Sequence, residues 1–220
     1  MRKLTRRQKR QIRFGILYGF AIIGMLTTGL FLFRKTTEFV EEIQKPKVVR
    51  EAPAIDEQIL EPNEYSRPGI ELPEVDGLVI HYTANPGTTA QQNHDYFAGL
   101  AASHLTKASS HYIIGLDGEI IQCIPETEQA YASNNRNADT LAIECCHFDA
   151  TGEFYMQTYQ SLVHLTAYLM GKYDIPIESV IRHYDVTGKS CPKYFVDHPD
   201  EWEQFLQDVE EYIDQYGTRE

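Results

Sequence analysis

The first 35 residues of this chain contain no aspartate or glutamate, although they hold nine of its 20 lysines and arginines. Beyond Lys35 the balance is reversed, because 11 basic residues stand against 32 acidic ones and leave a net formal charge of −21. An acidic surface repels the phosphates of nucleic acids and of anionic lipids. We therefore expect no nucleic acid partner for the part of the chain that follows Lys35.

Charged side chains are also absent from residues 14–33, a run of twenty residues rich in Leu, Ile, Phe and Gly. A helix of that length spans about 30 Å, close to the thickness of the hydrocarbon core of a bilayer. The run therefore predicts a single transmembrane helix over residues 14–33. The cations before it predict a basic cytoplasmic tail over residues 1–13 and place the rest of the chain outside the cell.

A cleaved signal peptide is the alternative to a membrane anchor. The apolar region of a signal peptide is normally shorter and ends in small residues of the Ala-x-Ala type. Here the run leads directly into Arg34 and Lys35 without such a site. The sequence therefore favours an uncleaved anchor at the cell membrane.

Cysteine is scarce, with four residues at Cys123, Cys145, Cys146 and Cys191. Outside the cell an even number of cysteines allows disulfides. Cys145 and Cys146 are neighbours in a predicted strand and point to opposite faces, so at most one of them can meet Cys123. A disulfide between Cys123 and one of the two is one alternative, and free buried thiols are the other.

Hydrophobic periodicity is missing from residues 34–72, where proline recurs at Pro46, Pro53, Pro62 and Pro68. This composition predicts an extracellular linker that is semi-extended, with a short helix over residues 38–44. Fully stretched, the linker would reach on the order of 100 Å. The folded domain is then expected over residues 73–220.

The predicted domain alternates strands with helices and contains no internal repeat. This pattern predicts an α/β fold in which a mixed central β-sheet is flanked by helices. The expected strands are residues 77–81, 111–115, 119–124, 140–146 and 180–183, and the expected helices are residues 89–105, 158–172 and 201–216.

Three residues can converge on a metal ion. His183 and Cys191 are eight positions apart, joined by a loop that contains Gly188, and His81 ends an apolar strand far away in the sequence. Two imidazoles and a thiolate that leave a fourth position for water form a catalytic zinc site. A zinc ion polarises a carbonyl and ionises water near neutral pH, so this pattern indicates a hydrolase.

Two charged residues suit the same chemistry. Glu144 lies inside an apolar strand, where an unpaired carboxylate is costly, so it is either a paired structural residue or a functional one. Beside an activated water it would be the general base. Lys189, two residues before Cys191, would stabilise the oxyanion that forms on an attacked carbonyl, although a solvated loop lysine is the alternative.

Four polar residues are candidate substrate contacts: His111, Asn134, Asn135 and His147. His111 opens a predicted strand after Ser110, and no Gly-x-Ser-x-Gly elbow accompanies this pair, which argues against a serine nucleophile. Asn134 and Asn135 suit a carbohydrate or peptide ligand, although ordinary turn chemistry also accounts for them. His147 follows the strand of Glu144.

Five motifs occur in a fixed order: VIHYTA at 79–84, SHYII at 110–114, IQCIPE at 121–126, AIE at 142–144 and RHYDVTGKSCP at 182–192. Together they resemble the zinc-dependent N-acetylmuramoyl-L-alanine amidases, the type that includes phage endolysin amidases and peptidoglycan-recognition proteins. The resemblance covers nearly all of residues 75–195.

The resemblance implies zinc ligands at His81, His183 and Cys191, a catalytic acid at Glu144 and a transition-state lysine at Lys189. It also implies a mixed sheet of five or six strands and cleavage of the amide between N-acetylmuramic acid and L-alanine in peptidoglycan. Some relatives carry a catalytic tyrosine where this chain has a serine, which leaves the proton transfer to the glutamate.

Two other functions stay open at this stage. A peptidoglycan sensor of the same fold would bind without cutting, but such relatives usually lack the cysteine ligand. A hydrolase with Cys191 as nucleophile would leave His81 and Glu144 without an evident role. The sequence Cys145-Cys146-His147 differs from what we expect of a typical member of the resembled family, and we have no physical account of it.

Overall fold

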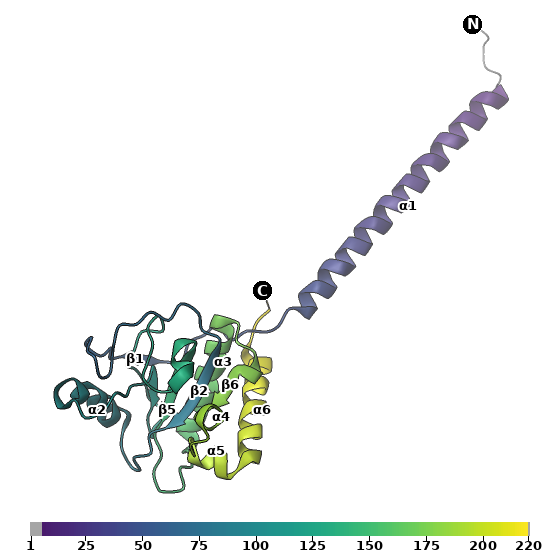
Figure 1. Cartoon of the computed structure of the whole chain (residues 1–220). Coiled ribbons are helices and arrows are strands. Elements are labelled where there is room, and N and C mark those ends of the chain that lie inside the picture. Colours follow the sequence, from purple (N-terminus) through teal and green to yellow (C-terminus); the bar gives the residue numbers. More distant parts are fainter. Residues whose placement is uncertain (1–5, 220) are drawn as a thin grey trace. The chain divides into compact units, whose positions relative to one another are not determined.

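The protein is represented by a computed structural model that describes residues 6–219 (Figure 1). Residues 1–5, which belong to the predicted basic tail, and Glu220 lie outside the described part. The chain divides into two units, one that contains Met1–Pro46 and Arg219–Glu220 and one globular unit over Lys47–Thr218. The two units are described separately.

The first unit is formed by a single helix, α1 (Arg6–Gln44), of 39 residues. Its stretch Arg13–Thr37 is long and apolar enough to cross a membrane. Large apolar side chains along it are exposed, Phe20 at 70% and Leu30 at 68%. The helix extends past the predicted span of residues 14–33 and takes in the short helix that the sequence predicts separately over residues 38–44.

The globular unit is built on one mixed sheet of six strands in the order β1-β4-β3-β5-β2-β6. Only β3 and β4 pair antiparallel, as expected for a hairpin, and the other neighbours run parallel. The predicted mixed sheet is confirmed. Its strands are β1 (Ile55–Glu57), β2 (Gly77–Tyr82), β3 (Tyr112–Ile114), β4 (Ile120–Gln122), β5 (Thr140–Cys145) and β6 (Val180–Arg182).

The helices cover both faces of the sheet. One face packs with α3 and α6 around a core that includes Leu78, Ile80 and Phe205, and the other packs with α2 around Phe97 and Leu100. Burial on both faces explains why β2 reads as a continuous apolar run. The helices are α2 (Ala90–Ser103), η1 (Asn134–Ala138), α3 (Met156–Tyr173), η2 (Ile177–Ser179), α4 (His183–Thr187), α5 (Lys193–Asp197) and α6 (Pro199–Tyr216).

The segment over residues 47–72 differs from its prediction as a linker. Val49, Leu60 and Leu72 are buried to 3%, 3% and 4% exposure, and β1 forms hydrogen-bonded pairs with β4. The globular unit therefore begins at Lys47 rather than at residue 73. The prediction failed because the apolar residues of this segment are isolated between prolines and show no helix or strand periodicity. Each of them nevertheless packs into a core that is formed mainly by other segments.

The cysteines are free thiols, and all four are buried. The backbone N–H of Cys123 donates to His111 before β3 begins, whereas Cys145 is paired with Ile114 at the end of that strand. The strand register thus separates Cys123 from Cys145 and Cys146 along the sheet. Of the two alternatives left open by the sequence, the structure has the free thiols.

Candidate metal centre and catalytic residues

Strand register aligns three of the predicted site residues. His81 in β2 is the direct partner of Glu144 in parallel strand β5, and partners in parallel strands point to the same face. On the other side of β2, Arg182 pairs with Ile80, so His183 follows opposite His81. The row Glu144–His81–His183 therefore runs across the carboxyl ends of three adjacent strands.

Cys191 reaches this row through a short helix and a turn. His183 begins α4, which ends at Thr187 and is capped by Gly188 with a φ of +76°, a left-handed conformation that favours glycine. The backbone N–H of Tyr184 then donates to the Cys191 carbonyl at 2.8 Å. This return places the Cys191 Sγ 3.8 Å from Nδ1 of His81.

Ligand atoms of His81, His183 and Cys191 lie within 4.8 Å of one another, and all three residues are buried. Burial lowers the pKa of both imidazoles, and the positive charge of Lys189 adds to this effect. Both rings are therefore neutral, which is the form that binds a metal. Two imidazole nitrogens and one sulfur are a donor set that suits zinc.

Burial disfavours the thiolate form of Cys191, and a bound cation would offset this cost. Burial raises its pKa to about 12, and the negative charge of Glu144 acts in the same direction, while a hydrogen bond from the backbone N–H of Tyr82 opposes it. A divalent cation favours the thiolate strongly. The residues present therefore fit a zinc ion.

Hydrogen bonds on the outer side fix both imidazole rings. Nε2 of His81 lies 3.1 Å from Oγ of Ser133, and Nε2 of His183 lies 3.1 Å from Oδ1 of Asn134. Each bond occupies one ring nitrogen and leaves Nδ1 for the cluster, as is usual for ligand histidines. The turn that carries both partners is held by Asn137, whose Oδ1 accepts from the backbone N–H of Ala132 at 3.1 Å.

The sequence pointed to Asn134 as a substrate contact and did not single out Ser133. The structure gives Asn134 a bond to His183, one of the predicted metal ligands, and its role as a substrate contact stays a prediction. Its left-handed φ of 56° is tolerated by asparagine better than by most residues. A run Ser-Asn-Asn before a buried strand is the only signal that the sequence offers for this role.

Glu144 and Lys189 lie beside the cluster. Burial raises the pKa of Glu144 to about 8, and the ammonium of Lys189 acts in the opposite direction. Among the described residues, Oε2 of Glu144 has no hydrogen-bond partner. A buried carboxyl with a raised pKa and a free oxygen can exchange a proton near neutral pH.

Three other predicted substrate contacts are not among the residues that bond the cluster. His111 is buried, its Nδ1 accepts from the backbone N–H of Ala142 at 2.9 Å, and its Nε2 lies 2.9 Å from the Glu128 carbonyl. Both ring nitrogens are thus taken by the backbone, and burial lowers the pKa of His111 to about 4. His147 is buried under Tyr82, with ring centroids 5.0 Å apart, and Asn135 is exposed on η1.

Ser110 occupies the position where some relatives of the resembled family carry a tyrosine. It is fully buried, and its hydroxyl donates to the carbonyls of Tyr112 and Ala142 at 2.9 and 2.8 Å. The bond to Ala142 holds the start of β3 to β5, and the bond to Tyr112 stays within the segment that enters β3. Ser110 therefore has a structural role in this chain.

A family model described as N-acetylmuramoyl-L-alanine amidase matches residues 71–194, which contain the whole cluster. The chain belongs to this amidase family. The match begins and ends close to the limits of the five motifs, and the residues 47–70 that complete the amidase domain lie before it.

Curated relatives agree with the family assignment. The amidase domain is 34% identical over 164 residues to the N-acetylmuramoyl-L-alanine amidase CwlL of Bacillus licheniformis, covering 69% of this chain and 45% of that protein. It is 30% identical to the amidase BlyA of Bacillus subtilis, covering 65% of this chain and 43% of the relative. The chain thus spans less than half the length of these relatives.

Solved structures share the fold of the amidase domain. The structure of PlyL matches with a TM-score of 0.60 and 26% identity, over 71% of this chain and 97% of that one. The catalytic domain of XlyA matches with a TM-score of 0.61 and 23% identity, over 71% of this chain and 99% of that one. The similarity to XlyA concerns the fold alone.

Proposed function

We propose that this chain is a zinc-dependent N-acetylmuramoyl-L-alanine amidase, which hydrolyses the amide between N-acetylmuramic acid and L-alanine in peptidoglycan. The observation that carries the proposal is the convergence of His81, His183 and Cys191 within 4.8 Å. Membership of the amidase family and relatives that bear this activity in their names support it. When bound, a zinc ion supplies Lewis acidity and activates water.

Glu144 acts as general base and then as general acid in this proposal. Its buried carboxyl, with a pKa raised to about 8, takes a proton from the attacking water and gives it to the departing amine of L-alanine. Proton transfer by a positioned side chain typically contributes about 10²–10⁴-fold to a rate. The serine at position 110 offers no alternative, because its hydroxyl is committed to the backbone.

Lys189 stabilises negative charge on the attacked carbonyl oxygen. The residue is exposed on the turn after α4, and its charge acts on Glu144, His81 and His183. A cation that is fixed near a developing oxyanion lowers the energy of the transition state more than that of the substrate. The site therefore combines a proton carrier and an oxyanion partner around one cluster of metal ligands.

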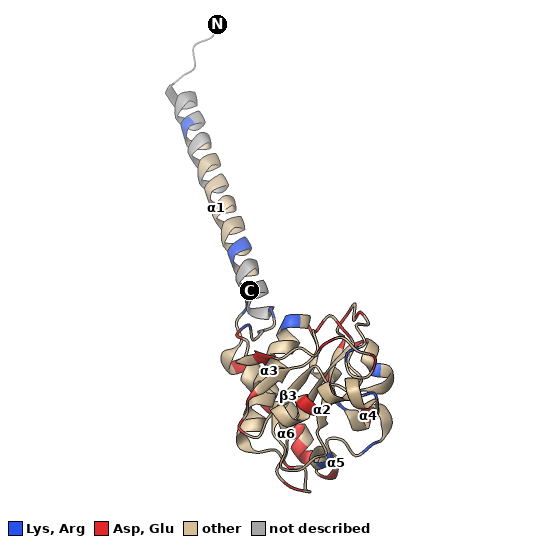
Figure 2. Ribbon diagram, turned by 90° about the vertical axis from the view of Figure 1, so that its left-hand side faces the viewer, with Lys and Arg blue, Asp and Glu red and all other residues tan. Residues whose placement is uncertain are grey.

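A membrane anchor completes the proposal. The stretch Arg13–Thr37 is a candidate span, and the cations near its start favour a cytoplasmic N-terminus. The amidase domain then faces the cell wall. Acidic residues are distributed over many elements of the globular unit (Figure 2), which favours an uncharged or cationic ligand over a polyphosphate.

Substitution of Glu144 tests the mechanism. Glu144→Gln keeps the size of the side chain but removes the proton carrier, so we expect a loss of amide hydrolysis of about 10²–10⁴-fold with metal content unchanged. Mass spectrometry of digested peptidoglycan, together with metal analysis, measures both. Glu74→Gln, at an exposed glutamate before β2, is the matched control and should leave both unchanged.

The same peptidoglycan digests distinguish an amidase from the alternative function, a non-catalytic sensor. A non-catalytic peptidoglycan sensor would leave intact amides in wild-type digests, whereas an amidase releases free stem peptides. Full activity of Glu144→Gln would show that another group moves the proton. Loss of metal from the same variant would make Glu144 a structural residue of the cluster rather than the general base.

A further inference from the structure

Few residues join the candidate membrane span to the globular unit. The span ends at Thr37, and helix α1 continues to Gln44. The helical rise over residues 38–44 adds about 10 Å, and the step from Gln44 to Lys47 adds at most about 10 Å more. Lys47, where the globular unit begins, is therefore held within about 20 Å of the end of the span. The linker over residues 34–72 that the sequence predicts would have reached on the order of 100 Å.

The first residues of the globular unit are bound to the rest of it and add no free length. The ammonium of Lys47 lies 3.2 Å from a carboxylate oxygen of Asp214. Val48 and Thr218 exchange two backbone hydrogen bonds of 3.0 Å each. A Cβ added at Gly171 would lie 3.1 Å from Cβ of Val48, so the segment also packs closely against α3. The connection to the anchor therefore enters the globular unit at one defined place.

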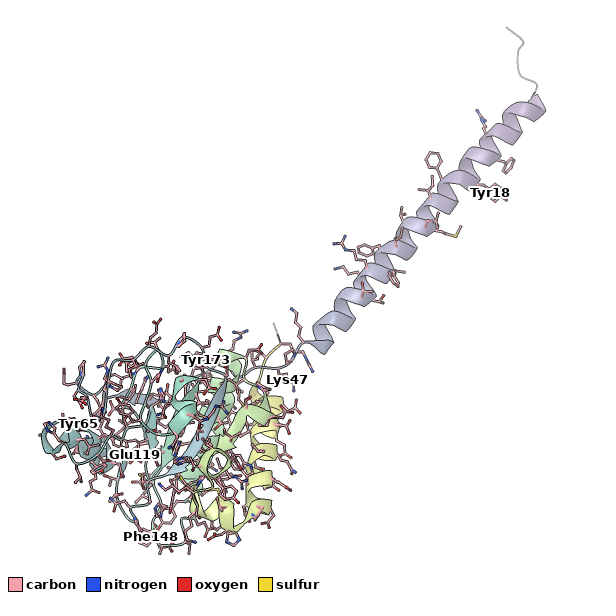
Figure 3. The ribbon with its side chains drawn as sticks, in the orientation of Figure 1. Tyr18, Lys47, Tyr65, Glu119, Phe148 and Tyr173 are labelled. Carbon is pink, nitrogen blue, oxygen red and sulfur yellow. The ribbon has the colours of Figure 1, made fainter. Side chains whose placement is uncertain are left out.

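This place lies at the end of the sheet where the parallel strands begin. Helix α3 connects β5 to β6, which both run parallel to β2, so α3 runs against these strands and its last residue, Tyr173, lies near the amino end of β6. The proposed ligands and Glu144 lie at the carboxyl ends of the same strands. Figure 3 shows Lys47 and Tyr173 at the upper side of the globular unit and Phe148, three residues after β5, at its lower edge. The entry of the connection and the cluster are thus at opposite ends of the sheet.

The size of the globular unit sets the outer limit of the reach. A compact unit over Lys47–Thr218 has a radius of gyration of about 16 Å, which corresponds to a diameter of about 40 Å. The cluster can use most of this diameter, because it lies at the far end of the sheet from Lys47. It can therefore stand at most about 60 Å from the end of the span. This limit follows from the number of residues and the size of the unit, whatever the arrangement of the two units.

We infer that the chain cuts only the peptidoglycan closest to the membrane, within about 60 Å of the end of its span. The inference rests on the proposed function, since that function supplies both the anchor and the reaction. The substrates are glycan strands with stem peptides that lie next to the membrane, and the outer layers of the wall are beyond reach. A tethered enzyme meets a substrate within its reach at a high effective concentration and one outside it almost never.

Muramoyl-peptides displayed at two heights above a bilayer test the inference. The full chain is reconstituted in dilute vesicles with a muramoyl-peptide on a lipid-anchored polyproline rod of about 10 or about 40 residues, which spans about 30 or about 120 Å. We expect the wild type to cleave the short display at least about tenfold faster than the long one, because a tether that cannot span the distance allows almost no encounter.

Lengthening the connection should remove this difference. About 30 prolines inserted between Lys45 and Pro46 add about 90 Å, so the lengthened variant should cleave the long display as well. The same run inserted between Arg2 and Lys3, on the other side of the apolar run, is the matched control and should behave as the wild type does. A soluble muramoyl-peptide should be cleaved equally by all three proteins, since its cleavage does not depend on reach.

Equal rates of the wild type on the two displays would overturn the inference, and so would a long display that the lengthened variant leaves uncut. In either case, cleavage of the soluble peptide keeps the amidase function. Failure of the wild type to cleave the soluble peptide rejects that function and the inference with it.

Discussion

At the scale of single residues, the two histidines proposed as metal ligands are each bonded to a side chain outside the proposed ligand set. Ser133 and Asn134 each take one ring nitrogen, which orients His81 and His183, and the amide oxygen of Asn134 requires a proton on Nε2 of His183. The sequence predicted the cluster itself from the spacing of His183 and Cys191, from His81 at a strand end and from the ordered motifs around them. It could not predict the partners, since serine and asparagine are common in any turn.

Asn134→Gly removes the amide and leaves the left-handed backbone at this position unstrained. We expect zinc affinity to fall about 10–100-fold, the usual effect of losing an outer partner of a ligand histidine. Competition with a chromophoric chelator measures the affinity without an activity assay. Asn135→Ala, at the exposed neighbour, should leave it unchanged. Equal affinity in all three proteins would mean that the bond to His183 does not hold the ring.

His111 is the opposite case, because the sequence assigned it a role at the site and the structure gives its ring nitrogens to the backbone. Its position at the start of a strand suggested a substrate contact, but the strand order of the sheet buries it and gives both ring nitrogens to backbone groups of β5 and of the loop at Glu128. A histidine that bonds only the backbone is part of the sheet. Sequence alone does not separate the two cases, because the type of residue is the same and only its neighbours differ.

At the scale of elements, strand β1 and the chain around it belong to the globular unit. Leu60 lies in the core between α2 and the sheet, and Val49 lies in the core on the other face. The segment thus closes both faces of the sheet as well as one edge. The sequence did not predict this role, because β1 has only three residues and the apolar residues around it are scattered. Neither feature produces a repeating pattern.

Leu60→Ala should therefore destabilise the domain. A buried leucine replaced by alanine costs about 2–5 kcal/mol, from lost transfer energy and the cavity left behind. Denaturant unfolding of the full chain in detergent measures the change. Ile70→Ala, in the same segment but 45% exposed, is the matched control and should cost far less. If Leu60→Ala leaves the free energy of unfolding unchanged, the segment is a spacer in solution and not part of the core.

At the scale of the whole molecule, charge and apolar content are divided between the two units. Nine of the 20 basic residues lie at or before Lys35, on either side of the apolar run, and the acidic ones begin only at Glu38. This division fits a cytoplasmic tail, a membrane span and a domain that faces the wall.

Removing residues 1–35 should convert a membrane protein into a soluble one. We expect the full chain to sediment with membranes, to resist a salt wash and to enter solution with detergent, since about 20 apolar residues insert almost irreversibly. The truncated chain should stay in solution. An intact mass that lacks the apolar run would instead support the signal peptide, and a full chain that stays soluble without detergent would reject the span.

The sequence by itself determined five of the six strands, the three long helices of the globular unit, the apolar run and the three donors of the cluster. These features depend on local periodicity and on residue types with few alternative uses. Only the tertiary structure decided that residues 47–72 join the domain, that His111 bonds the backbone and that Ser133 and Asn134 bond the rings of His81 and His183. Each of these depends on contacts between residues far apart in the chain, which the order of the strands creates and no local pattern records.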